Sequence, residues 1–222
     1  MRLRDRGVSQ PLPFPLPLGH TQAVVNLLNK VKNRVRGLKQ RWGSTGVRRE
    51  LWNREFAEGR WANIEDTSGD VIYKFLEKYA ARGSILDLGC GSGNTGCELN
   101  PAAYRDYLGV DIADVAVEKA LARSRALKRE SRNNYVQGDI EIFSPPQKYD
   151  VILFRESIYY IPVSRVQAAL DRYRQFLTPA GVIIIRFHDQ SQAAGILPLL
   201  QTGREIIEKN EPASGPVIFV VR

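Results

Sequence analysis

The sequence predicts an α/β protein with a doubly wound, mostly parallel sheet of seven strands that ends in an antiparallel hairpin. From residue 70 onward, short apolar runs alternate with segments of helical spacing, which is typical of a parallel sheet covered by helices. A glycine-rich turn follows the first apolar run directly. The last two apolar runs are separated only by the turn NEPASGP, which is too short for a crossover helix, so they are expected to pair as a hairpin.

The individual helices and strands follow from the spacing of apolar residues. In residues 70–81, Val71, Phe75 and Tyr79 fall on one side of a helix. Further helices are expected at 94–99, 115–127, 164–177 and 192–200. The strands are expected at 85–88, 107–111, 134–137, 149–154, 182–187, 205–209 and 217–221.

Composition and charge narrow the class of protein. The chain of 222 residues is 43% apolar and 25% charged, as in ordinary globular proteins. Two cysteines make no disulfide framework, and no apolar run is long enough to span a membrane, so a cytoplasmic protein is expected. Residues 1–60 hold 13 Lys+Arg and 4 Asp+Glu, a charge of +9, and the remaining residues sum to −1. This asymmetry argues against a basic groove for nucleic acid over the whole domain.

The basic N-terminal quarter divides into a tail and a helix. Alternating prolines make residues 1–19 a flexible tail. Residues 20–45 are expected to contain a basic amphipathic helix, because lysines and arginines flank an apolar arc on both sides over residues 21–42. Two alternatives stay open: peripheral contact with a membrane surface, or docking of the apolar stripe on this protein or on a partner.

Residues 46–65 come next and are expected to form a lid or substrate segment before the main domain at 66–222. Trp52, Phe56 and Trp61 would supply its apolar contacts. The alternative is that these aromatic residues only staple the segment to the edge of the sheet.

The glycine turn indicates which kind of cofactor the chain could bind. A dinucleotide fingerprint counted from Gly89 fails at Asn94, and one counted from Gly91 begins two residues too late. What fits from the strand end is an acidic residue, Asp87, followed by glycine at alternate positions: Gly89, Gly91 and Gly93. An acidic side chain suits a cationic ligand, and bare backbone suits one that packs closely.

At this point the chain resembles the class I S-adenosylmethionine-dependent methyltransferases over about residues 66–222. The motifs are ILDLGCGSG, YLGVDIADVAVEKA, YVQGDIEIF and YDVILFRESIYYIP, in that order. The resemblance implies a Rossmann-like methyltransferase fold and S-adenosyl-L-methionine as cofactor. The implied cofactor contacts are Asp87, Gly89, Cys90, Gly91 and Gly93 for the methionine part, Asp111 with Ile112 for the ribose, Asp139 with Ile140 for the adenine, and Arg155.

Two of these residues also have a plain structural explanation. Asp111 could cap the helix that follows it, because Asp is favoured at helix N-termini, and Asp139 could be a turn residue after Gly138. Cys97 is expected to be a small buried residue, and no metal site is expected.

The residues expected to handle the acceptor lie at the next two strand ends. Glu156, Tyr159 and His188 are the catalytic candidates, with pocket shaping or hydrogen bonding as the alternative for each, and Asp189 is expected only to cap the next helix. Motifs of the branches that modify nucleic-acid bases are absent, so a small-molecule acceptor is expected, with a sugar or lipid-linked headgroup suggested by the basic helix. The competing hypotheses are a NAD(P)-dependent oxidoreductase and a non-catalytic protein that docks on a membrane or partner; the oligomeric state stays open.

Overall fold

The computed structural model describes residues 18–61 and 67–222, and side chains in the first helix from residue 25 onward. The chain consists of two compact units, residues 1–37 and residues 38–222, here called the sheet unit. Helix α1, Leu18–Trp42, begins in the first unit and ends in the second. Leu18 and Gly19, which we had expected in the tail, are helical, and the rest of the predicted tail lies outside the described residues.

The sheet has the predicted seven strands, in the order β3-β2-β1-β4-β5-β7-β6. The strands β1 to β5 are mutually parallel neighbours, and β7 pairs antiparallel with both β5 and β6, which confirms the predicted hairpin. The chain order reverses between β1 and β4, which is where ligands bind in sheets of this kind. The bounds are Ser84–Leu88 (β1), Asp106–Asp111 (β2), Asn133–Gln137 (β3), Tyr149–Arg155 (β4), Leu177–Phe187 (β5), Ile206–Asn210 (β6) and Val217–Val221 (β7).

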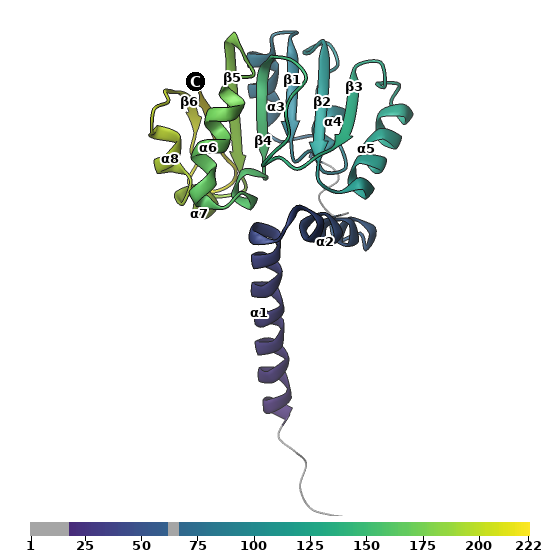
Figure 1. The fold of residues 1–222 in the computed structure, drawn as a ribbon, viewed down its shortest axis with the longest axis vertical. Coiled ribbons are helices and arrows are strands. Elements are labelled where there is room, and N and C mark those ends of the chain that lie inside the picture. The colour runs from purple at the N-terminus through teal and green to yellow at the C-terminus, as the bar shows by residue number, and fades with distance from the viewer. Residues whose placement is uncertain (1–17, 62–66) are drawn as a thin grey trace, which may run out of the picture. The chain divides into compact units, whose positions relative to one another are not determined.

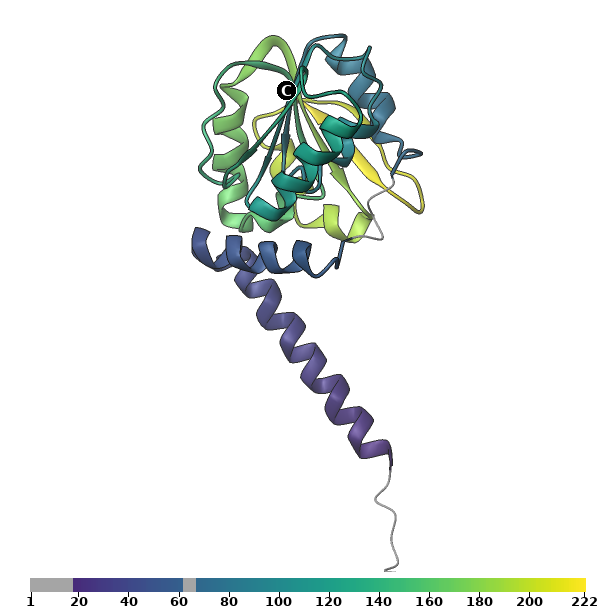
Figure 2. The same cartoon turned by 90° about the vertical axis from the view of Figure 1, so that its right-hand side faces the viewer.

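Helices cover both faces of this sheet (Figure 1). One face packs against α3 (Ile72–Ala80) and α5 (Asp114–Ala126), with the short α4 (Asn94–Glu98) between them in the chain. The other face packs against α6 (Val163–Arg174), α7 (Gln190–Ala194) and α8 (Leu197–Gln201). In Figure 2 the green α6 and the blue α3 lie on opposite sides of the strands. The apolar side chains of both sheet faces are therefore removed from water, which stabilises the fold.

Two predicted boundaries were wrong for local reasons. The predicted helix 164–177 ends at Arg174, and β5 begins at Leu177 and pairs there with Tyr149. The predicted helix 192–200 is two short helices, because Gly195 ends α7 and Pro198 occupies the first turn of α8. Asp189 accepts a hydrogen bond from the Gln192 amide at the start of α7, which confirms its predicted capping role.

The segment that follows α1 is helical as well. Ser44 caps α2 (Thr45–Ala57), because its side chain accepts a hydrogen bond from the Val47 amide. Within the sheet unit, α2 lies beside the carboxyl ends of β1, β2 and β3 (Figure 1). None of the helices in the described part of the chain is long and apolar enough to cross a membrane.

Candidate functional site

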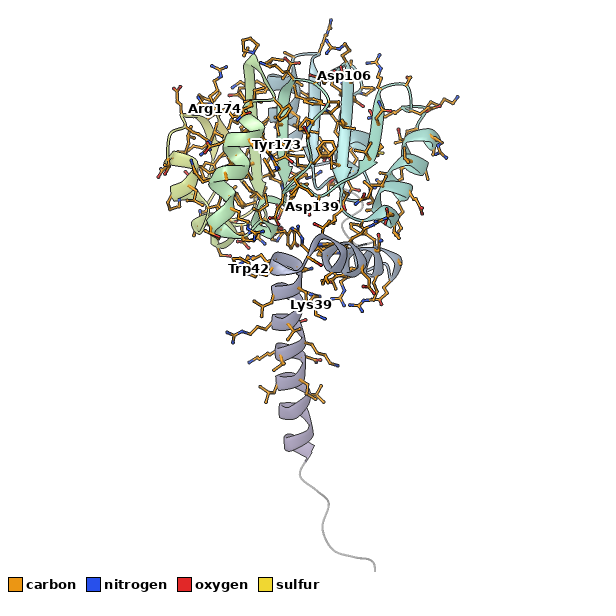
Figure 3. All side chains as sticks on the ribbon, viewed as in Figure 1. Lys39, Trp42, Asp106, Asp139, Tyr173 and Arg174 are labelled. Carbon is orange, nitrogen blue, oxygen red and sulfur yellow. The ribbon has the colours of Figure 1, made fainter. Side chains whose placement is uncertain are left out.

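A cavity of about 600 Å³ lies at the carboxyl ends of the strands, within the sheet unit. It is bordered by α2, by the glycine turn after β1 and by the residues that follow β2, β3, β4 and β5. Figure 3 shows Asp139 at this end of the sheet, facing α2, and Asp106 at the opposite end. The predicted site residues that line the cavity are Asp87, Gly89, Cys90, Gly91, Asp111, Ile112, Asp139, Ile140, Arg155, Glu156, Tyr159 and His188.

The three glycines of the turn have positive φ angles but different surroundings. Gly91 (φ 53°) borders the cavity, and a Cβ there would meet only the Phe56 ring, at 3.6 Å. A Cβ on Gly89 (φ 86°) would lie 2.5 Å from the Cβ of Ser157. A Cβ on Gly93 would lie 2.8 Å from the Cβ of Ala120 on α5, and Gly93 does not line the cavity. A glycine at this position therefore allows the close packing of α5 and does not provide the predicted ligand contact.

Replacing Gly89 with alanine is expected to destabilise the protein by about 2 kcal/mol, because the backbone is left-handed and the methyl group would clash with Ser157. Denaturant unfolding measures this change. Gly46→Ala is the matched control: Gly46 lies in α2 with nothing near its Cβ position, so alanine there should leave stability equal or slightly higher. Equal stability of the two variants would contradict the geometry of the turn.

Asp111 ends β2 and holds the glycine turn in place. Its Oδ2 accepts a hydrogen bond from the Gly91 amide at 2.9 Å, and its Oδ1 accepts one from the Ala113 amide at 2.9 Å. Ala113, not Asp111, occupies the N-cap position of α5. Burial raises the pKa of the Asp111 carboxyl to about 6, although the two amides oppose this rise. Each oxygen still has a lone pair available to a ligand on the cavity side.

Asp87 and the two cysteines near it are buried. One oxygen of Asp87 accepts a hydrogen bond from the Tyr107 hydroxyl, and the other, Oδ1, has no hydrogen-bond partner among the described residues. Burial raises the pKa of the Asp87 carboxyl. Burial also raises the pKa of the Cys90 thiol, so this residue is no nucleophile. Cys97 is a small buried side chain, as predicted.

Asp139 is bound by α2, which the sequence did not indicate. Oδ2 of Asp139 accepts hydrogen bonds from the Thr45 hydroxyl, at 2.7 Å, and from the Arg48 guanidinium. The same guanidinium binds Glu141, and Oδ1 of Asp139 accepts from the Glu141 amide at 3.0 Å. Arg48 and Asp139 are both buried. Thr45 and Arg48 stand one helical turn apart, a spacing that is visible in the sequence but does not reveal their partner.

A charged network lines another part of the cavity. Glu156 accepts hydrogen bonds from the Tyr159 hydroxyl, at 2.9 Å, and from Arg186. Arg186 and Arg155 both bind Asp70, at 2.8 and 2.9 Å. Glu156 also has a φ of 56°, which is unusual for a residue with a side chain.

His188 and the aromatic residues complete the wall. His188 is exposed, and its backbone amide donates to Gln192. Trp52 contacts Tyr160 edge to face, with ring centroids 4.8 Å apart, and lies 5.7 Å from Trp61. These rings line the cavity, so the aromatic residues of the predicted lid segment reach its interior.

Comparison with known proteins supports the predicted family. Residues 86–183, which include most of β1, all of β2 to β4 and most of the residues that line the cavity, match the sequence model of a methyltransferase domain. Over this region the chain is similar to the S-adenosylmethionine-dependent methyltransferases. It is 29% identical over 163 residues to the mRNA cap guanine-N(7) methyltransferase of Schizosaccharomyces pombe, covering 65% of this chain and 45% of the relative. It is 30% identical over 150 residues to N-terminal Xaa-Pro-Lys N-methyltransferase 1 of Danio rerio, covering 63% and 65%.

Solved structures show the same fold. The N-methyltransferase NodS of Bradyrhizobium japonicum, in complex with S-adenosyl-L-homocysteine, has a TM-score of 0.63 at 19% identity and covers 78% of this chain and 97% of its own. The magnesium protoporphyrin IX methyltransferase of Synechocystis has a TM-score of 0.64 at 15% identity, covering 80% and 99%. The chain spans 45% to 65% of the length of the two curated relatives above.

Proposed function

We propose that this methyltransferase transfers a methyl group from S-adenosyl-L-methionine to a small-molecule acceptor. The main support is that three consecutive strands, β1, β2 and β3, bring Asp87, Asp111 and Asp139 to one cavity beside the glycine turn. The matches named above are methyltransferases, which favours this function over the NAD(P)-dependent oxidoreductase.

The residues of the cavity fit such a cofactor. A buried carboxylate oxygen of Asp87 without a partner among the described residues suits a cationic group, and Gly91 leaves the backbone open on the cavity side. Asp111 would hold the ribose hydroxyls through the free lone pairs of its carboxylate, and Ile112 and Ile140 would contact the adenosine part. When bound, S-adenosyl-L-methionine supplies an electrophilic methyl group on a sulfonium.

The other wall would bind the acceptor. Glu156 and Tyr159 are joined by a hydrogen bond, His188 is exposed at the edge, and the aromatic cluster of Trp52, Trp61 and Tyr160 offers apolar surface. We propose that Glu156 orients the acceptor and that Tyr159 or His188 contacts it. Mixed aromatic and polar walls suit a compact acceptor such as a sugar or a lipid-linked headgroup.

Cofactor affinity is expected to fall at acidic pH, because the Asp111 carboxyl has a pKa of about 6. Below that pH the carboxyl is protonated, so the Kd of S-adenosylhomocysteine should rise up to about tenfold per pH unit. The pKa of this carboxyl is 3.8 in the unfolded chain and about 6 in the folded protein, so the folded state binds the proton more tightly. Its contribution to the stability of the fold is therefore present below pH 3.8 and is lost as the pH rises through about 6. Calorimetric titration across this window tests the affinity, and a flat profile would contradict it.

Glu156→Gln is expected to raise the KM of the acceptor about tenfold, because one charge-assisted hydrogen bond to the acceptor is lost. The affinity for S-adenosylhomocysteine should stay unchanged, because Glu156 is not among the residues that we propose to hold the cofactor. Steady-state kinetics and calorimetry measure the two quantities separately. The exposed Glu118→Gln on α5 is the control.

Two measurements test the proposed function itself. Calorimetry should detect binding of S-adenosylhomocysteine and none of NAD or NADP. A screen of small-molecule acceptors with labelled methyl donor should then find product that disappears with Asp111→Asn. Binding of a nicotinamide cofactor alone would favour the oxidoreductase instead.

A further inference from the structure

Helix α1 has a composition unlike the rest of the chain. Its 25 residues include no Asp or Glu and six basic residues, Lys30, Lys32, Arg34, Arg36, Lys39 and Arg41. Its large apolar side chains are exposed, between 46% and 63% each: Val25, Leu27, Leu28, Val31, Val35, Leu38 and Trp42. So many exposed apolar side chains on one helix indicate a surface that another phase or molecule covers.

The residues are arranged around the helix in three zones. At about 100° per residue, the apolar side chains other than Val25 form one continuous arc, and Val25 lies beyond its edge, among the basic side chains. Lys32, Arg36 and Lys39 flank the arc on one side, and Lys30, Arg34 and Arg41 flank it on the other. Neutral polar residues, including Asn29 and Asn33, occupy the opposite face. Basic side chains at the edges of an apolar arc can bury their stems and keep their charges at a polar, anionic boundary.

The same arrangement of side chains argues against a second copy of this chain as the molecule that covers the apolar arc. Leu28, Val31, Val35, Leu38 and Trp42 follow the spacing of a coiled-coil seam, but the flanking heptad positions hold Lys32, Arg34, Lys39 and Arg41. In a parallel dimer these like charges would face each other and repel. In addition, Leu27 widens the arc beyond a seam of two positions per heptad. A broad apolar arc with cationic borders matches a lipid surface better than one partner helix.

The last turn of α1 belongs to the sheet unit and is fixed beside the cavity. Gln40 is buried and lines the cavity, and Arg41 donates a hydrogen bond to the Tyr159 carbonyl oxygen at 3.0 Å. The last turn of α1 therefore contributes to the wall where we place the acceptor.

We infer that α1 is an interfacial helix that binds this methyltransferase to a membrane surface containing anionic lipids, without crossing it. The apolar arc enters the boundary of the acyl chains, and the two rows of basic side chains contact the headgroups. This inference goes beyond methyl transfer and does not depend on it.

Vesicle co-sedimentation of the full chain tests the inference. Vesicles of phosphatidylcholine with phosphatidylglycerol should bind the protein, and vesicles of phosphatidylcholine alone should bind it far more weakly. Leu28→Gln with Val31→Gln should lower binding to the anionic vesicles at least about tenfold, because two apolar side chains leave the acyl boundary. Lys32→Gln with Lys39→Gln should lower it roughly fivefold per lysine.

The control is Asn29→Gln with Asn33→Gln on the opposite face, which should bind like the wild type. All variants must keep the wild-type affinity for S-adenosylhomocysteine and the wild-type unfolding curve, so that lost binding does not reflect misfolding. If the Leu28 and Val31 variant bound the anionic vesicles as tightly as the wild type, the basic side chains alone would account for binding, and the inference would be overturned. The inference would also be overturned if the wild-type protein did not bind vesicles but formed a dimer in light scattering, and if the Leu28 and Val31 variant were monomeric.

Discussion

Asp111→Asn is expected to weaken the binding of S-adenosylhomocysteine by roughly 100-fold. The two charge-assisted hydrogen bonds that we propose between the ribose hydroxyls and the Asp111 carboxylate would become weaker or be lost. The carboxylate accepts the Gly91 and Ala113 amides with one lone pair on each oxygen. Asparagine keeps one acceptor oxygen and turns an amide group toward the other backbone donor. Isothermal calorimetry with the purified protein measures the change.

The same substitution should alter stability much less than affinity. Asparagine loses one hydrogen bond, but it also removes a charge whose burial is unfavourable, as the raised pKa of Asp111 shows. Asp106→Asn is the control, because Asp106 begins the same strand at the opposite end of the sheet (Figure 3). Its affinity for S-adenosylhomocysteine should match that of the wild type. A similar loss of affinity in both variants would mean that the cavity is not the cofactor site.

Arg48→Ala is expected to detach α2 from the sheet unit. The Arg48 side chain is 10% exposed, and the side chains of its two partners, Asp139 and Glu141, are 3% and 9% exposed. Without the guanidinium, two carboxylates would remain buried close together, which costs about 3–5 kcal/mol when one partner of a buried pair is removed. Undocking of α2 returns water to both carboxylates and is the less costly response.

Limited trypsin digestion and denaturant unfolding measure this outcome. Cleavage at arginines within α2, such as Arg54, should accelerate by an order of magnitude or more, since local detachment exposes the backbone. Arg49→Ala is the control: Arg49 lies on the same helix as Arg48 and binds Asp114 of α5, but its side chain is about half exposed, so its loss should change cleavage little. Cleavage of the Arg48 variant at the control rate would mean that α2 is held by its aromatic contacts alone.

Local patterns in the sequence were enough to predict the sheet and the positions of three acidic residues. The strands are apolar runs whose period and length are visible in a short window, and the missing crossover before Val217–Val221 required the antiparallel hairpin. Asp87, Asp111 and Asp139 each follow or end such a run, so parallel topology alone places them at one edge. Boundaries depended on single residues such as Gly195 and were predicted less well.

The amino-acid sequence by itself thus determined the order of the elements, the resemblance to a family and the strand ends that border the cavity. Only the tertiary structure decided which side chains bind these residues: Arg48 binds Asp139, 91 positions away in the sequence, and Arg186 binds Glu156, 30 positions away. It also turned Gly93 toward α5 rather than the cavity. The physical reason is that period and propensity act between near neighbours along the chain, whereas buried charges are paired by whichever distant segment folds against them.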